Sequence, residues 1–120
     1  GGETILVVED DENTLEAVCD ILRTLNYHAL PASNGAQALE IFEWRHDEIS
    51  LVISDMVMPT MSGSTLYTKL REVKPEIKMV IITGYPFGEQ DRTMLSQGIV
   101  AWVQKPFVME QIATAIRDAL

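Results

Sequence analysis

The stretch LVISDMVMP, residues 51–59, decides the fold. Four residues that suit a buried strand lead directly into one carboxylate, Asp55. Pro59 then blocks any simple continuation of a helix or of a ladder of backbone hydrogen bonds. In a parallel sheet, strand ends open onto the crevice in which ligands bind. Asp55 is therefore a candidate functional residue if other reactive groups converge on it.

Length and composition fit a single domain over residues 1–120. Apolar residues make up 47% of the 120 residues and charged residues 22%, which is a globular balance with enough apolar material for one core. The single cysteine, Cys19, cannot form an internal disulfide. It falls on the apolar stripe of a predicted helix, so we interpret it as a buried, reduced thiol.

The charge balance excludes some partners. Eighteen acidic and nine basic residues give a net charge of −9, which repels nucleic acid and anionic membranes. The apolar runs are too short to span a bilayer, and the first residues lack the features of a signal peptide. We expect a cytoplasmic domain that binds neither nucleic acid nor membrane, with both chain ends cut from a longer protein.

Five predicted strands alternate with five predicted helices. The strands are expected at residues 4–8, 27–32, 51–54, 78–83 and 99–103, and the helices at 12–25, 34–46, 64–73, 87–97 and 109–120. This alternation predicts a parallel sheet with right-handed crossovers and helices on both faces. The fold class is α/β, flavodoxin-like, with strand order 2-1-3-4-5 and the strand that contains Pro31 at an edge.

Helix signals support these boundaries. Asp11 is a suitable N-cap for the first helix, and Asn34 with Gln37 predicts a capping box at the second. The helix over residues 87–97 has the smallest apolar face. The expected inward residues of the other four helices are Leu15, Val18, Cys19, Leu22 and Leu25; Ala38, Leu39, Ile41 and Phe42; Leu66, Leu70 and Val73; and Met109, Ile112, Ile116 and Leu120.

Reactive side chains follow four of the five strands, and all should lie at one edge of the sheet. Glu9 and Asp10 follow the first strand, Asp55 the third, Thr83 the fourth and Lys105 the fifth. Carboxylates that lie close together repel one another unless they share a proton or bind a cation. Mg²⁺ suits this set because it takes oxygen ligands, and zinc does not because neither His nor Cys joins the set.

The same residues can support phosphoryl chemistry. An aspartate beside Mg²⁺ can attack phosphorus and form an aspartyl phosphate. Thr83 can then hydrogen-bond a phosphoryl oxygen, and Lys105 can neutralise its charge. Taken alone, the acids at residues 9–11 are better interpreted as a solvated helix start favoured by the macrodipole, and Lys105 as an ordinary surface lysine. Their coincidence with Asp55 favours a site.

Four short motifs carry a family resemblance that covers essentially the whole chain. They are VVEDD at residues 7–11, ISDMVMP at 53–59, IITG at 81–84 and QKPF at 104–107. In this order the chain resembles the receiver domain of two-component response regulators. Its opening and closing stretches most resemble the receiver at the C-terminal end of hybrid sensor histidine kinases.

The resemblance implies a site and its partners. Asp55 would take a phosphoryl group from a phosphohistidine on a histidine kinase or histidine phosphotransfer domain. Mg²⁺ would be held by Asp10, Asp55 and the backbone carbonyl of Val57, with Glu9 holding metal-bound water. The Lys105-Pro106 peptide would be cis. A second copy of the chain is a further candidate partner.

Two positions depart from the family pattern. Trp102 stands where the family has a switch aromatic that responds to the residue matching Thr83, but it is bulkier than the usual Tyr or Phe. An aromatic that packs the edge of the sheet is an equally good interpretation. Val57 replaces a side chain that is often polar in the family, so we hypothesise slow self-dephosphorylation.

The leading functional hypothesis is a phosphoacceptor switch that catalyses its own phosphorylation and dephosphorylation, with any kinase activity in another domain. A degenerate receiver that acts as a constitutive interaction module is the alternative. A haloacid-dehalogenase-type phosphatase would need a second acid where Val57 stands. A flavodoxin would place the flavin phosphate against the acids that follow the first strand.

Overall fold

The computed structural model describes residues 2–56, 58, 61–84 and 99–120. Its elements, in chain order, are β1 (Thr4–Val8), α1 (Glu12–Thr24), β2 (His28–Ala32), α2 (Gly35–Arg45), β3 (Ile49–Asp55), α3 (Gly63–Val73), β4 (Met79–Thr83), β5 (Ile99–Gln104) and α5 (Met109–Ala119). The helix expected over residues 87–97 lies outside the described residues.

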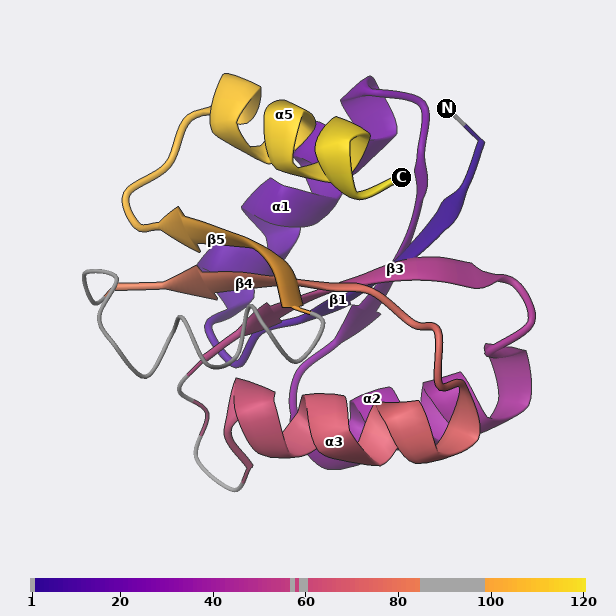
Figure 1. Cartoon of the computed structure of the whole chain (residues 1–120). Coiled ribbons are helices and arrows are strands. Elements are labelled where there is room, and N and C mark those ends of the chain that lie inside the picture. Colours follow the sequence, from indigo (N-terminus) through magenta and orange to yellow (C-terminus); the bar gives the residue numbers. More distant parts are fainter. Residues whose placement is uncertain (1, 57, 59–60, 85–98) are drawn as a thin grey trace.

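The five strands form one parallel sheet in the order β2-β1-β3-β4-β5. Helices α1 and α5 cover one face, and α2 and α3 cover the other (Figure 1). The predicted flavodoxin-like order is confirmed, and β2, which contains Pro31, is an edge strand as expected. This order brings the carboxyl ends of the central strands β1, β3 and β4 side by side.

The core consists of two apolar clusters, one on each face of the sheet. On one face, Phe42 of α2 and Leu66 and Leu70 of α3 are fully buried. On the other face, Val18 and Leu22 of α1 are fully buried. Each such side chain contributes about 1.5–3 kcal/mol to stability. Every residue of β4 is buried, as expected of a central parallel strand covered on both sides. The sheet is therefore a rigid support for the side chains at its strand ends.

The predicted helix caps are present. The Asp11 side chain accepts a hydrogen bond from the Thr14 N–H at 3.3 Å, and the Asn34 side chain accepts one from the Gln37 N–H at 2.8 Å. The Gln37 side-chain oxygen accepts from the Ser33 N–H at 2.6 Å, one residue before the position at which a capping box closes. Asp11 thus fixes the start of α1 directly after the acidic pair.

Three predictions of inward residues are wrong. Val73, Met109 and Leu120 are 41–42% exposed. Each stands at or just beyond a helix end. At these positions the apolar sequence pattern still continues, but the helix no longer contacts the sheet. Tyr67, 4% exposed, and Ala115, 8% exposed, occupy inner positions that the pattern did not assign.

Candidate functional site

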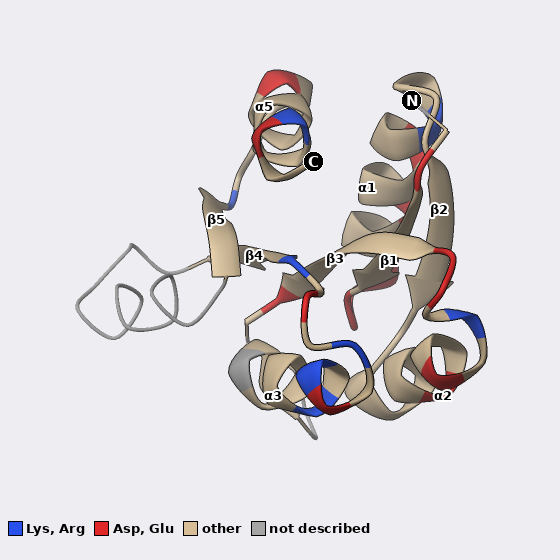
Figure 2. Cartoon of the chain, turned by 45° about the vertical axis from the view of Figure 1, so that its right-hand side comes forward, with Lys and Arg blue, Asp and Glu red and all other residues tan. Residues whose placement is uncertain are grey.

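Four strands deliver the predicted site residues to one edge of the sheet. Asp55 is the last residue of β3 and Thr83 the last of β4, while Glu9 follows β1 directly and Lys105 follows β5 directly. Acidic residues at the ends of β1 and β3 are coloured red in Figure 2. Because the strands are parallel, all four residues lie at the same edge of the sheet.

Three carboxylates form the centre of the site. Oxygen atoms of Glu9, Asp10 and Asp55 all lie within 4.8 Å of one another. Glu9 is 3% and Asp55 is 8% exposed, whereas Asp10 faces solvent. Solvent therefore screens the charges of Glu9 and Asp55 from each other only weakly. Asp10 leaves one side of the cluster open to solvent.

Lys105 supplies a positive charge to this cluster. Its Nζ atom lies 3.3 Å from Glu9 Oε1 and 3.4 Å from Asp55 Oδ2. The Lys105 backbone N–H donates to the Thr83 carbonyl at 2.7 Å, which extends the β4–β5 pairing to the site itself. The Lys105-Pro106 peptide bond is cis, as expected.

The local charges shift the pKa of two of these groups. Burial and then the neighbouring Asp55 carboxylate raise the pKa of Glu9 to about 7, although the Lys105 ammonium opposes this shift. Burial lowers the pKa of Lys105, but the Glu9 and Asp55 carboxylates outweigh it and leave that pKa raised. Lys105 is thus charged at neutral pH.

The carboxylate cluster fits Mg²⁺. All three side chains offer oxygen, the donor that Mg²⁺ prefers, and neither His nor Cys belongs to this described cluster. The exposed position of Asp10 leaves room for water and for a phosphate oxygen, which Mg²⁺ usually retains among its ligands. A bound cation would also relieve the repulsion from Asp55, which adds to burial in raising the pKa of Glu9.

The remaining predicted residues have different positions. Thr83 is 1% exposed at the end of β4. Trp102, on edge strand β5, is partly buried and packs against the cluster under α2 and α3. Met56, Met58 and Met61 also pack there and fill space beneath the residues that follow β3. Val57 lies outside the described residues.

Two residues that support Asp55 were not predicted. The Ser54 hydroxyl donates to the Asp55 carbonyl at 2.9 Å, and the Gly63 N–H donates to the Met56 carbonyl at 2.8 Å. Both contacts depend on the path of the chain after β3, which strand periodicity does not define. The only sequence signal was a glycine at the start of a helix, after the Ser62 N-cap.

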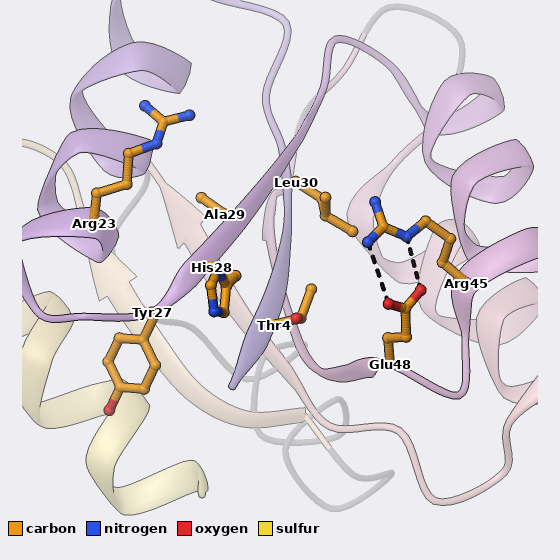
Figure 3. Close-up of a pocket in the computed structure, with 8 residues that line it drawn as sticks. All are labelled: Thr4, Arg23, Tyr27, His28, Ala29, Leu30, Arg45 and Glu48. Atoms are coloured by element: carbon orange, nitrogen blue, oxygen red, sulfur yellow. Dashed lines mark hydrogen bonds and ion pairs between the residues drawn. The ribbon is translucent and has the colours of Figure 1, made fainter. Parts of the chain in front are cut away.

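A separate hollow of about 600 Å³ lies at the opposite end of the sheet, beside edge strand β2 (Figure 3). Its charges are paired and exposed: Arg45 Nε lies 2.8 Å from Glu48 Oε2, and Arg23 lies 3.4 Å from Asp20. It therefore lacks the crowded buried charges of the carboxylate cluster. Its lining residues are Thr4, Arg23, Tyr27, His28, Ala29, Leu30, Arg45 and Glu48.

Comparison with known proteins decides the family. The protein-family model that describes the response regulator receiver domain matches residues 5–117 of this chain. The chain belongs to this family. Receiver domains are modules of two-component signal transduction, and the carboxylate cluster is compatible with Mg²⁺. No helix in the described ranges is both long and apolar enough to cross a membrane.

Several relatives and solved structures resemble this receiver. Sensor kinase CckA of Brucella abortus is 34% identical over 120 residues, which is all of this chain but only 13% of that protein. A receiver domain protein of Clostridium thermocellum is 28% identical, with a TM-score of 0.87 over 98% of this chain and 93% of that chain. Response regulator TrrA of Thermotoga maritima, solved in complex with Mg(2+)-BeF, is 28% identical, with a TM-score of 0.82 over 98% of this chain and 99% of that chain.

Proposed function

We propose that this receiver accepts a phosphoryl group on Asp55 from a phosphohistidine of a histidine kinase or histidine phosphotransfer domain, and passes on the signal by a change of shape. One observation carries the proposal. Asp55 is a buried carboxylate whose neighbours are two more acids within 4.8 Å and the Lys105 ammonium at 3.4 Å. A nucleophile, a cation site and a counter-charge thus occur together.

The side chains have distinct roles in the transfer. An Asp55 carboxylate oxygen forms a bond to phosphorus while the bond between phosphorus and the histidine nitrogen breaks, and the imidazole leaves. Lys105 balances negative charge on the phosphoryl group, and the Thr83 hydroxyl donates a hydrogen bond to one phosphoryl oxygen. These groups position and stabilise the phosphoryl group, which is the main requirement of phosphoryl transfer.

The cation site follows from the same cluster. Asp10 and Asp55 would hold Mg²⁺ directly, and Glu9 would hold its water, with the Val57 carbonyl as the further ligand predicted from the sequence. When bound, Mg²⁺ supplies positive charge that offsets the carboxylates and the phosphoryl oxygens. The valine side chain cannot orient an attacking water, so we retain the prediction of slow self-dephosphorylation.

A groove beside Lys105 is suited to the phosphodonor. It holds about 500 Å³ between the start of α1 and the segment before α5, and its lining residues are Asn13, Thr14, Ala17, Lys105, Pro106 and Phe107. Val108, next in the chain, is 57% exposed. A donor that brings a phosphohistidine to Asp55 would contact this apolar surface, because the surface adjoins the ammonium that faces the acceptor.

The donor surface has its own test. Ala17→Glu places a bulky charge in the groove, and we expect it to slow transfer from a phosphorylated histidine phosphotransfer domain by about tenfold. It should leave phosphorylation by a small acyl-phosphate donor unchanged. Ala36→Glu, an exposed alanine on α2, is the matched control. Equal rates for the two variants with the protein donor would contradict the assignment of this surface.

Trp102 is the proposed reporter of the shape change. It lies on β5, two positions from the strand end, and Thr83 pairs with Gln104 in the same ladder. Trp44 is 83% exposed, so Trp44→Phe leaves Trp102 as the only tryptophan without removing a core residue. We expect Trp102 emission to change on phosphorylation. Unchanged emission would support the alternative of a static edge aromatic.

The relatives suggest a larger context. Because the chain spans only 13% of the Brucella abortus sensor kinase, we propose that it is one module of a longer, cytoplasmic phosphorelay protein whose kinase activity lies in another domain. A second copy of the receiver remains a predicted partner.

Intact mass measurement tests the proposed function. Wild-type protein treated with acetyl phosphate and Mg²⁺ should gain the mass of one phosphoryl group, and Asp55→Asn should gain nothing. Omission of Mg²⁺ should suppress the gain in the wild type. A wild-type mass that does not change would favour the alternative of a degenerate receiver.

A further inference from the structure

We infer that Gly63, the first residue of α3, is a positioning residue for the phosphoacceptor. Its missing side chain lets the start of α3 lie directly against the backbone of Asp55. The inference rests on the proposed phosphorylation of Asp55. It assigns a role to a residue that touches neither the phosphoryl group nor the cation in the proposed reaction.

The contact leaves no room for a side chain. A Cβ atom on Gly63 would stand 2.8 Å from the Asp55 backbone oxygen and 3.2 Å from Met56 Cα. It would also stand 3.1 Å from Ile81 Cδ1. Two of these neighbours are backbone atoms, which cannot rotate away as the end of a flexible side chain can. The chain itself would have to move at the residue that carries the acceptor carboxylate.

Three hydrogen bonds already hold the backbone of Asp55 and Met56, two of them to the peptide between these residues. Its carbonyl, on Asp55, accepts the Ser54 hydroxyl at 2.9 Å, and its N–H, on Met56, donates to the Ile82 carbonyl at 3.1 Å. The next carbonyl, on Met56, accepts the Gly63 N–H at 2.8 Å. A displacement by a new Cβ must therefore strain or break at least one of these hydrogen bonds.

Such a displacement would change the geometry of the acid cluster. Glu9 and Asp10 follow β1, whereas Asp55 moves with the end of β3 and the start of α3. Pushing the Asp55 backbone thus shifts one carboxylate relative to the other two. Catalytic and metal-binding groups must be held to within about 0.5 Å, and a misplacement of about 1 Å can slow a reaction about 100-fold.

Gly35 offers a matched comparison. A Cβ atom on this glycine, the first residue of α2, would stand 2.8 Å from Met61 Sδ, 3.0 Å from Met61 Cβ and 3.3 Å from Met61 Cε. The crowding is therefore as close as at Gly63, but all three neighbours belong to one side chain. The Sδ and Cε atoms can move away by rotation about the side-chain bonds, and Met61 Cβ must give by a few tenths of an ångström. None of these atoms belongs to Asp55.

The experiment compares Gly63→Ala with Gly35→Ala in the same chain. For each variant we would measure the Mg²⁺ dissociation constant by tryptophan fluorescence and the rate of phosphorylation by acetyl phosphate at saturating Mg²⁺. Thermal unfolding reports any general loss of stability. We expect Gly63→Ala to bind Mg²⁺ about tenfold more weakly and to react about 10- to 100-fold more slowly. Gly35→Ala should stay within about threefold of wild type in both measurements.

A double variant separates the two kinds of contact at Gly63. Ile81→Val removes the Cδ1 atom that a Cβ would meet at 3.1 Å but leaves the Asp55 oxygen at 2.8 Å. Gly63→Ala with Ile81→Val should therefore remain slow. Recovery of the wild-type rate in the double variant would show that core crowding causes the defect, and it would overturn the inference.

Ser54→Ala provides a test that adds no atoms. It removes the hydroxyl that holds the same Asp55 carbonyl and should slow phosphorylation about three- to tenfold. If Gly63→Ala does not fold, this variant decides the question, and a wild-type rate for Ser54→Ala overturns the inference. A wild-type rate and Mg²⁺ affinity in folded Gly63→Ala would overturn it directly. Failure of the wild type itself to gain phosphate would instead contradict the proposed function, while the Mg²⁺ measurement would still test the effect of Gly63.

Discussion

The two ends of the sheet differ in how their charges are balanced. At the amino ends, the Lys74 ammonium donates to the backbone carbonyls of His46 and Ile49 at 3.0 and 2.9 Å. The Lys78 ammonium donates to the Ala119 carbonyl near the end of α5 at 2.8 Å. At the carboxyl ends, three carboxylates cluster together, and the Lys105 ammonium contacts two of them, Glu9 and Asp55.

The contacts at the amino ends of the strands therefore stabilise the fold, whereas the groups at the carboxyl ends form the candidate functional site. The amino-end lysines donate to backbone carbonyls at the ends of α2 and α5 and at the start of β3, and so join segments far apart in the sequence. The carboxyl-end acids are crowded and partly buried, and burial followed by the charge of Asp55 raises the pKa of Glu9. A bound cation would relieve the repulsion between these acids and would also offset the negative charge of a phosphoryl group. Substitutions at the two ends should therefore have opposite effects on stability and activity.

Asp55→Asn should produce the largest contrast. We expect it to abolish phosphorylation and, without Mg²⁺, to raise the free energy of unfolding by about 1–2 kcal/mol, because it removes one of the crowded charges. Mg²⁺ should stabilise the wild type but not the variant. Urea unfolding with and without Mg²⁺ measures both effects. A less stable variant in metal-free buffer would mean that repulsion at this end is not dominant.

Lys74→Met should show the opposite pattern. It leaves two backbone carbonyls without their charged donor, so we expect a loss of about 1.5–3 kcal/mol in the free energy of unfolding. Phosphorylation of the folded protein should be unchanged. Lys69→Met changes an exposed lysine of α3, the helix that ends just before Lys74, and as the matched control it should differ little from wild type. If both variants are equally stable, the amino-end contacts do not stabilise the fold.

The pH dependence of metal-free stability should follow Glu9. Its pKa is about 7 in the folded chain and about 4.5 when unfolded, so between these values the folded state binds more protons. The contribution of Glu9 to stability is present at low pH and is lost as pH rises through 7. Glu9→Gln should therefore gain stability over the wild type between pH 5 and 8, by on the order of 1–2 kcal/mol. Parallel unfolding curves across this range would contradict the repulsion that we assign to the cluster.

Arg45→Gln should have the smallest effect. The Arg45–Glu48 ion pair is about half exposed and joins neighbours on the same short segment. Exposed ion pairs contribute at most about 1 kcal/mol, so we expect a change below about 0.5 kcal/mol and no effect on phosphorylation. Chemical denaturation and the acetyl phosphate assay check these two expectations. A larger loss would indicate that ion pairs, rather than lysine–carbonyl bonds, stabilise the amino end.

The sequence predicted the sheet order and the convergence of Glu9, Asp55, Thr83 and Lys105, because parallel strands fix which ends lie together. It did not predict the close approach of Gly63 to Asp55. That contact depends on the loop path between β3 and α3, to which neither helical nor strand periodicity applies. Periodicity also failed at helix ends such as Val73, where the packed surface stops before the pattern does.

Reductive trapping of the phosphorylated protein tests the central claim most directly. Borohydride reduces an acyl phosphate on aspartate to homoserine, which peptide sequencing by mass spectrometry can locate. After treatment with acetyl phosphate and Mg²⁺, we predict homoserine at position 55 and unmodified aspartate at position 10. Homoserine at another position, or at none in a protein that has gained phosphate, would contradict the assignment of Asp55 as the phosphoacceptor.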